Sequence, residues 1–99
     1  MLWQVEKSGP RLRVSRKRQK ALLSLLRQVR EEKGLRQKDV SDALGYPQSV
    51  VSKYESGERR LDLIELYDLC AVLSVPFQEF AIRLDRTLEK LRRPKGPIP

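Results

Sequence analysis

Apolar residues recur at intervals of three or four along most of this chain, the spacing that places side chains on one face of an α-helix. The interval is kept over residues 15–33 and again over residues 77–91, and no segment shows the alternation of a half-buried strand. Glycine follows three of the periodic segments, where helices commonly close with a left-handed residue: Gly34, Gly45 and Gly57. The pattern therefore predicts an all-α fold.

The pattern predicts five helices joined by short connections. Ser15 is a candidate cap for the first, and Pro47 suits the start of the third, because the first turn of a helix needs no amide hydrogen. Asp62 and Glu65 have the spacing of a capping box for the fourth. The expected helices are residues 15–33, 37–44, 48–56, 62–73 and 77–91. Their inward positions would be Leu22, Leu25, Leu26, Val29, Val40, Ala43, Leu44, Val51, Tyr54, Leu66, Leu69, Cys70, Leu73, Phe77, Phe80 and Leu84.

The chain of 99 residues suits one compact domain with spare length at both ends. Gly9-Pro10 interrupts any helical period near the N-terminus, so we expect residues 1–14 to form a basic flexible arm. Residues 15–91 would form the domain, with a helix-turn-helix at 37–56. The proline-rich residues 92–99 would form a non-helical tail.

The predicted helix at residues 48–56 has one apolar face and one small polar face. With Gln48 as zero and about 100° per residue, Val51 and Tyr54 fall near 300° and 240°. The other side carries Ser49, Ser52, Lys53 and Ser56, and Gln48 and Val50 flank this outward arc. In a major groove, glutamine pairs with adenine, serine with either base type, lysine with guanine or a phosphate, and valine can touch a thymine methyl. An ordinary amphipathic surface helix also has a polar outer face, so this helix alone does not decide.

The formal charge of +8 lies mostly at the two ends of the chain. Residues 1–20 carry seven basic side chains and one acidic one, and residues 86–99 carry five and one, whereas residues 61–85 carry one and five. Residues 21–60 are mildly basic, so this polarity would turn the helix pair towards a phosphate backbone. Basic residues near the N-terminus could lie along phosphates, enter a minor groove or simply be solvated: Arg11, Arg13, Arg16, Lys17 and Arg18.

The sequence lacks the residues that several classes of function require. There is no histidine and one cysteine, Cys70, which argues against a metal site, a disulfide and imidazole catalysis. No glycine loop for phosphates and no pair of carboxylates in a cleft can be assembled, so we expect neither an enzyme nor a cofactor. No apolar run approaches the roughly 20 residues of a membrane span, and residues 1–20 lack the apolar stretch of a secretory signal. We expect a cytoplasmic protein without membrane association.

Two segments together carry a family resemblance. They are Gly34-Leu35-x-Gln37 and, after Leu44-Gly45, the run Gln48-Ser49-Val50-Val51-Ser52-Lys53-Tyr54-Glu55-Ser56-Gly57-Glu58-Arg59-Arg60. Over residues 20–84 the chain resembles the Cro/repressor type of helix-turn-helix, the lambda-repressor-like DNA-binding domains. The resemblance implies a compact bundle of about five helices in which the third helix reads the bases of double-stranded DNA.

The same resemblance assigns roles by position. The groove would be faced by Gln48, Ser49, Ser52 and Lys53, and the DNA backbone would be touched by Gln37, Ser56, Arg59 and Arg60. Arg36 stands where the family often has a capping Thr, Ser or Asn, so a phosphate contact would replace the cap. Arg30 and Glu55 match a family ion pair between the first and third helices; the alternative is two exposed charges worth under about 1 kcal/mol.

These observations predict a transcriptional repressor that binds paired half-sites as a homodimer. The apolar stripe of the last helix is longer than one domain needs, and the dimer candidates are Phe80, Leu84, Leu88 and Leu91. Leu88 and Leu91 could instead cover the underside of the bundle. The alternative function is an antitoxin or adaptor module that binds a small protein partner through its acidic helices at residues 61–91, with or without DNA binding.

Overall fold

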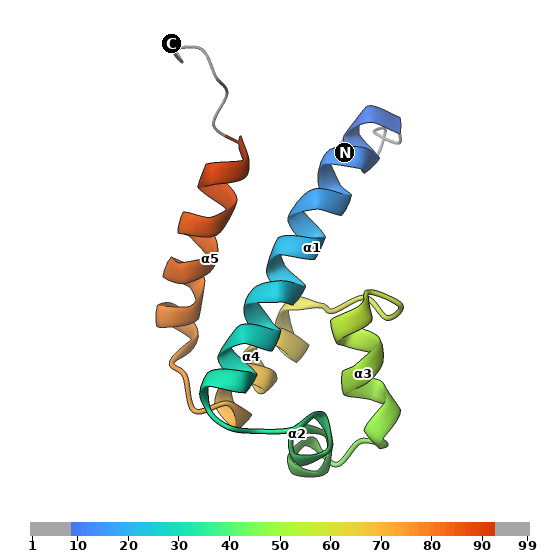
Figure 1. Ribbon diagram of the computed structural model, residues 1–99, viewed down its shortest axis with the longest axis vertical. Helices are drawn as coiled ribbons and strands as arrows, with labels where there is room; N and C mark the ends of the chain where they lie inside the picture. The colour runs from blue at the N-terminus through green and yellow to red at the C-terminus, as the bar shows by residue number, and fades with distance from the viewer. Residues whose placement is uncertain (1–8, 93–99) are drawn as a thin grey trace.

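The computed structural model describes the backbone of residues 9–92 and the side chains of residues 16–91. That backbone contains helices and no strand, which confirms the predicted all-α class. In chain order the helices are α1 (Gly9–Glu32), α2 (Gln37–Leu44), α3 (Gln48–Ser56), α4 (Leu63–Val72) and α5 (Phe77–Arg92) (Figure 1).

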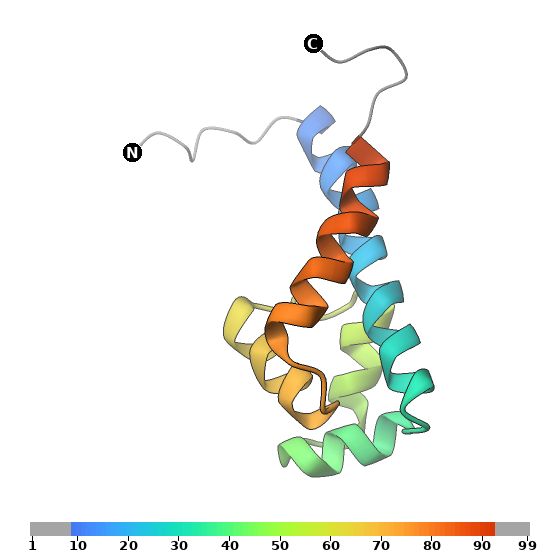
Figure 2. The same cartoon turned by 90° about the vertical axis from the view of Figure 1, so that its left-hand side faces the viewer.

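The two long helices, α1 and α5, lie side by side and antiparallel in both ribbon views (Figures 1 and 2). The three short helices gather around the C-terminal half of α1, where α3 packs against α1, and α2 packs against α3 and α4. The N-terminal half of α1 and the C-terminal half of α5 extend beyond this group (Figure 2). The molecule therefore has an inner end with five helices and an outer end with two.

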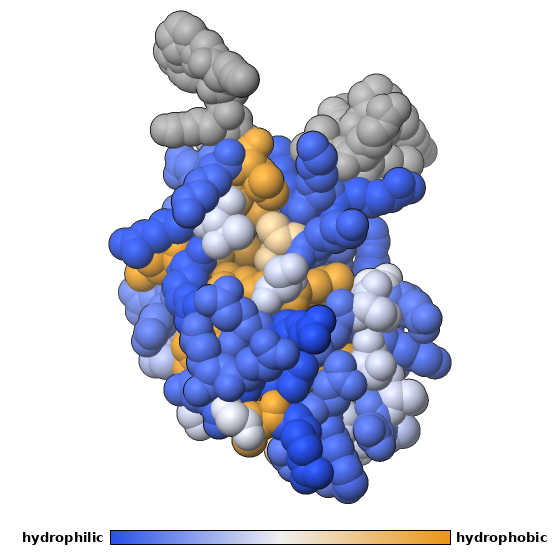
Figure 3. Space-filling view, viewed as in Figure 1, coloured by the Kyte–Doolittle hydropathy of each residue, from blue (hydrophilic) through white to orange (hydrophobic). Residues whose placement is uncertain are grey.

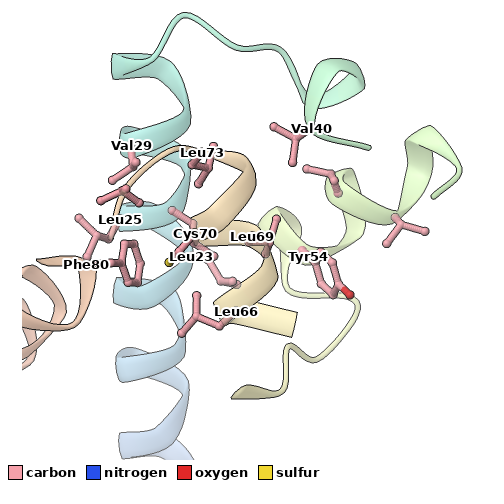
Figure 4. Close-up of a cluster of buried hydrophobic side chains, with 14 residues drawn as sticks. Leu23, Leu25, Val29, Val40, Tyr54, Leu66, Leu69, Cys70, Leu73 and Phe80 are labelled. Carbon is pink, nitrogen blue, oxygen red and sulfur yellow. The ribbon is translucent and has the colours of Figure 1, made fainter. Parts of the chain in front are cut away.

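The core lies between all five helices and is made of aliphatic side chains around a few larger ones (Figure 4). Tyr54, Phe80, Val29, Val40 and Cys70 are its largest fully buried side chains. Burying one large apolar side chain contributes roughly 1.5–3 kcal/mol, so this cluster accounts for most of the favourable free energy of folding. Phe80 is 0% exposed, so it belongs to the core and the prediction that it contacts a second copy is wrong.

The predicted start of the first helix is also wrong. α1 begins at Gly9 rather than at Ser15. Gly9-Pro10 does not break the helix, because a proline in the first turn removes an amide hydrogen that would have no helical partner there. Residues 9–14 of the expected arm are thus helical, whereas residues 1–8 and 93–99 lie outside the described residues.

The glycine ends of α1, α2 and α3 and the capping box of α4 agree with the sequence prediction. Gly34, Gly45 and Gly57 have φ of 72°, 78° and 87°, the left-handed conformation that glycine adopts without strain. The capping box of α4 is present: Asp62 Oδ1 accepts from the Glu65 amide at 2.8 Å, and Glu65 Oε1 accepts from the Asp62 amide at 3.0 Å.

Candidate nucleic-acid interface

The connection between α2 and α3 is fixed by hydrogen bonds around one buried serine. The amide of Tyr46 donates to the Ser41 carbonyl at 2.9 Å, which closes α2 at its glycine. The Ser41 hydroxyl donates to the Gln48 carbonyl at 3.3 Å, and Ser41 is 0% exposed. The first turn of α3 is therefore tied directly to α2. Ala43, which we expected inward, is exposed, because the helix turns Ser41 and Val40 towards α3 instead.

The outer face of α3 carries the polar side chains that the sequence placed there. Val51 and Tyr54 are buried, as expected. Gln48, Ser49, Lys53 and Ser56 are exposed and Ser52 is half-buried. In Figure 1, α3 lies at the edge of the inner end, with no helix on its outer side. The described residues thus leave this polar face open to a ligand.

Val50 is the exception on this helix, because it is buried with 9% of its surface exposed. At about 100° per residue it lies only about 40° from Tyr54, which faces the core. That angle brings the isopropyl group to the edge of the apolar face, where it packs with the core cluster. The prediction that Val50 lies on the outer face and meets a thymine methyl is therefore wrong.

Glu55 joins α3 to both preceding helices. Its carboxylate accepts from Arg30 Nε at 2.6 Å and from Arg30 Nη2 at 3.0 Å, which is the ion pair expected between the first and third helices. Arg30 Nη1 also donates to the Leu35 carbonyl at 2.8 Å. Both side chains are 10% exposed, and the hydrogen bond to Glu55 raises the pKa of Arg30. A buried charge is tolerated when it is paired and hydrogen-bonded as fully as this one.

Gln37 completes that network in a way the sequence did not indicate. Its side-chain amide nitrogen donates to Glu55 Oε1 at 2.9 Å, which links the N-terminus of α2 to the end of α3. One of the two N–H donors of this amide is engaged, and the second can still donate to a phosphate oxygen. The side chain of Gln37 is therefore held in place for an internal role, whereas its phosphate contact remains a prediction. Helical periodicity cannot reveal such a bond, because it joins residues 18 positions apart.

Arg36 precedes α2 and lies against Asp39. The Asp39 carboxylate accepts from the Arg36 amide at 2.8 Å and from its guanidinium at 2.9 and 3.2 Å. The guanidinium bond and then the amide bond lower the pKa of Asp39 to about 2. The amide bond caps the helix from within its first turn, so part of the missing cap is replaced by Asp39. The guanidinium is 74% exposed, and its Nε and Nη2 bonds to Asp39 leave further N–H donors for a phosphate.

The last residue of α3 and the turn that follows it carry a second group of polar side chains. The Ser56 hydroxyl donates to the Lys53 carbonyl at 3.2 Å. Arg59 lies over the Tyr54 ring at 5.3 Å and within 3.8 Å of the Glu65 carboxylate. Arg60 is exposed. Arg59 is therefore paired with a carboxylate, whereas Arg60 forms no ion pair with a side chain among residues 16–91.

Tyr54 itself is 1% exposed, and its hydroxyl forms no hydrogen bond of acceptable geometry with a described residue. Figure 4 shows this oxygen at the border of the apolar cluster. Burial, and secondarily the neighbouring Glu65 carboxylate, raises the pKa of Tyr54 to about 12. The ring therefore anchors α3 to the core as a neutral group.

Within residues 16–91, no cluster of three or more His, Cys, Asp or Glu side chains could hold a metal ion. No described helix is long and apolar enough to cross a membrane.

Two short helices locked at a glycine turn, the second presenting polar side chains outward from a helical support, define a helix-turn-helix domain. A family model described as helix-turn-helix matches residues 26–80, more than half of the chain. This chain belongs to that family, in its Cro/repressor type, which confirms the resemblance found in the sequence. The family is one of DNA-binding regulators and the chain is not an enzyme.

Two relatives support the assignment. The chain is 37% identical over 59 residues to an uncharacterized HTH-type transcriptional regulator, y4dJ, of Sinorhizobium fredii (strain NBRC 101917 / NGR234), which covers 60% of this chain and 77% of that protein. Among solved structures it resembles an XRE-family like protein from Pseudomonas syringae pv. tomato str. DC3000, with a TM-score of 0.74 and 38% identity over 80% of this chain and 96% of that one.

Proposed function

We propose that this protein is a cytoplasmic, sequence-specific DNA-binding repressor that inserts α3 into the major groove. The observation that carries the proposal is the open polar face of α3 on a rigid mount. Glu55 and Ser41 fix α3 against α1 and α2 through hydrogen bonds within the chain. A reading helix that is already fixed loses little conformational entropy on binding, which favours specific recognition.

In this proposal Gln48, at the start of α3, forms paired hydrogen bonds with an adenine. Ser49 and Ser52 meet neighbouring base edges, and Lys53 meets a guanine or a phosphate. The DNA backbone contacts come from exposed or partly exposed residues around the reading helix: Arg36, Gln37, Ser56, Arg59 and Arg60. Val50 is left out of the contact set because its side chain is buried.

The test is to select DNA sequences that bind the purified protein and then to measure affinities for the selected site and for its single-base variants. Gln48→Ala should lose about 1–3 kcal/mol of discrimination at one base pair while other positions are read as before. Glu58→Ala is a suitable control, since Glu58 is exposed in the turn after α3. Equal affinity of the wild-type protein for all duplexes would contradict base reading.

The proposal includes a homodimer formed through the outer half of α5. Leu91 is 47% exposed there, and Leu84 and Leu88 are half-buried. Figure 3 shows apolar surface between α5 and α1 with hydrophilic side chains around it. Arg18 of α1 lines a hollow of about 290 Å³ with Asp85 and Glu89 of α5, so this face carries both signs of charge and can match a second copy of itself.

Leu88→Asp should convert the dimer to a monomer in sedimentation experiments and should remove cooperative binding to paired half-sites. Half-sites of such a dimer should lie about 34–36 Å apart, one turn of DNA. Arg86→Asp, on the other side of α5, is the control for added charge. A wild-type protein that sediments as a monomer both with and without operator DNA would exclude this part of the proposal.

A second candidate function, an antitoxin or adaptor module, is favoured by the exposed face of α4. Leu63, Ile64 and Tyr67 are 65%, 67% and 56% exposed. Asp62 and Asp68 flank them, so the partner would be a small protein with a basic and apolar surface. A partner identified after purification and then prepared separately should bind this chain, and Ile64→Asp should abolish that binding while Gln48→Ala leaves it unchanged. If both variants bind the partner as tightly as the wild-type protein does, the partner uses another surface.

A further inference from the structure

The basic side chains of this protein fall into two groups that differ in their partners. Five arginines lie within 4 Å of a carboxylate: Arg27 with Glu31, Arg30 with Glu55, Arg36 with Asp39, Arg59 with Glu65, and Arg83 with Glu32. Lys38 pairs in the same way with Asp42. Arg16, Lys20 and Arg60 belong to the second group, whose members are exposed and form no ion pair with any side chain among residues 16–91; the others are Lys17, Arg18, Lys33, Lys53, Arg86 and Lys90. Their charges are therefore neutralised by no described part of the protein.

Arg16, Lys20 and Arg60 lie on the side of the molecule that carries α3. Gly57, which ends α3, lies against α1, because a Cβ built on it would be 3.6 Å from Leu23 Cδ1. Arg16 and Arg60 line the same open hollow, which is also lined by Gly57 after α3 and by Leu84 and Leu88 of α5. In Figure 1 the N-terminal half of α1 continues past the end of α3 and leans to the same side of the molecule.

Lys20 follows Arg16 by four positions on α1, so the two side chains are neighbours on one face of the helix. Arg18 also lines the hollow that Arg16 and Arg60 share, but it lines a second hollow with Asp85 and Glu89 as well, so carboxylates lie near its charge. From Leu23 to Arg16 the helix advances about 10 Å at about 1.5 Å per residue. Successive phosphates of one DNA strand are about 3.4 Å apart along the axis, so this reach corresponds to roughly three nucleotides.

We propose that Arg16 and Lys20 of α1, together with Arg60, bind backbone phosphates of duplex DNA just outside the bases that α3 reads. The inference rests on the proposed DNA-binding function and adds a flanking contact to it. The partner is the sugar-phosphate backbone rather than a base edge. A helix about 10–12 Å wide cannot enter a minor groove about 6 Å wide, whereas long cationic side chains on its surface can reach the phosphates on either rim.

The salt dependence of binding tests this inference. Each phosphate contact adds about 0.9 to the slope of log affinity against log salt concentration. Arg16→Ala and Lys20→Ala should each reduce the slope by about 0.9, so that the affinity ratio to wild type changes about 3.5-fold between 50 and 200 mM salt. Base preference should not change. Arg86→Ala removes an exposed charge from α5 and should leave the slope at the wild-type value.

Shortening the DNA gives a second, independent measurement. Removing roughly three base pairs beyond the site on the α1 side should weaken wild-type binding. The same truncation should have no effect on the double variant R16A/K20A, because its flanking contact is already lost. Sedimentation of each variant with DNA should show the wild-type stoichiometry, which separates this effect from dimer formation.

The outcomes separate this inference from the proposed function. Unchanged slopes together with equal sensitivity to truncation would overturn the flanking contact, while Gln48→Ala would still report base reading. A protein that binds all sequences alike, but loses slope with Arg16→Ala, would retain the phosphate contact and refute the base-reading function. A change in the stoichiometry of Arg16→Ala and Lys20→Ala with DNA, without a change in the salt slope, would also overturn the flanking phosphate contact.

Discussion

The inner and outer ends of this molecule treat polar groups in opposite ways. At the inner end Ser41, Arg30 and Gln37 all bond within the chain, and these bonds hold α2 and α3 in one arrangement. At the outer end, made of residues 16–22 of α1 and 84–91 of α5, an open hollow of about 460 Å³ is lined by Arg16, Arg18, Leu22, Leu84 and Leu88. The inner end is therefore fixed by hydrogen bonds within the chain, whereas the outer end exposes apolar and cationic side chains that another molecule can contact.

The largest expected effect lies in the inner network. Glu55→Ala would leave the Arg30 guanidinium buried without its carboxylate, so we expect a loss of about 3–5 kcal/mol in the free energy of unfolding. Urea denaturation followed by circular dichroism measures it. The surface pair of Arg83 and Glu32, whose side chains are 32% and 48% exposed, supplies the control. Glu32→Ala should shift the midpoint far less, and equal shifts would break the distinction between the inner pair and a surface pair.

A pair of variants sharpens this expectation. Arg30→Met combined with Glu55→Leu removes both charges and keeps apolar volume, so much of the stability should return. Gln37 would then lose its acceptor on Glu55. If the network serves mainly to orient α3, this stable double variant should still bind DNA with reduced base discrimination.

The second effect concerns alkaline pH and the two buried acidic groups of the core. Burial raises the pKa of Cys70 to about 11 and that of Tyr54 to about 12. In the unfolded chain these groups lose their protons near pH 8.5–10, before the folded protein does. The unfolded state therefore binds fewer protons over this range, and stability should fall between about pH 9 and pH 12, by on the order of 1–3 kcal/mol.

Denaturant titrations at a series of pH values would measure that fall. Tyr54→Phe removes the upper part of it, and it also removes a buried hydroxyl that has no partner among the described residues. Its stability at neutral pH should be equal to or slightly above wild type, because the hydroxyl makes no bond that could be lost. A marked loss at neutral pH would show that the hydroxyl is bonded after all.

The third effect is smaller and lies in the turn. Ser41→Ala removes the hydrogen bond to the Gln48 carbonyl and should cost about 0.5–1.5 kcal/mol. It should also loosen the first turn of α3 and weaken discrimination at the base that Gln48 reads. Ser24→Ala changes the same group on the exposed side of α1, where no loss is expected. If the two serine variants behave alike, the turn owes its geometry to glycine and packing alone.

The sequence predicted most of the inner end because its signals are local. Glycines at the ends of periodic segments gave the helix boundaries, and the spacing of Asp62 and Glu65 gave the cap of α4. The polar side of α3 followed from its period, and the partners Arg30 and Glu55 followed from the family resemblance. These features depend on neighbours in the chain or on a pattern shared by a whole family, so no knowledge of the packing was needed.

The errors arose where packing or chain context decides. Gly9-Pro10 has the composition of a break, yet a proline at a helix start costs nothing, so α1 extends back to Gly9. Val50 lies on the border between two faces, and an angle alone cannot assign a border residue. The bond from Gln37 to Glu55 engages a side chain to which the sequence assigned only a phosphate contact. Such a contact is decided only when three helices meet.

The smallest effect tests whether Arg36 belongs to the inner network or is available to DNA. The Arg36 guanidinium and amide lower the pKa of Asp39 to about 2. Arg36→Ala should return the pKa of this carboxyl towards 3.8, its unperturbed value, in an NMR titration. A group with a lowered pKa in the folded state stabilises the fold above its unfolded pKa, so this contribution is lost as pH falls from about 4 to about 2. Lys38→Ala is the control, since its main partner is Asp42.

The same titration in the complex with DNA shows whether Arg36 contacts a phosphate. If a phosphate draws the guanidinium away from Asp39, the pKa of Asp39 rises on binding. A pKa that stays near 2 in the complex would instead keep Arg36 as an internal residue.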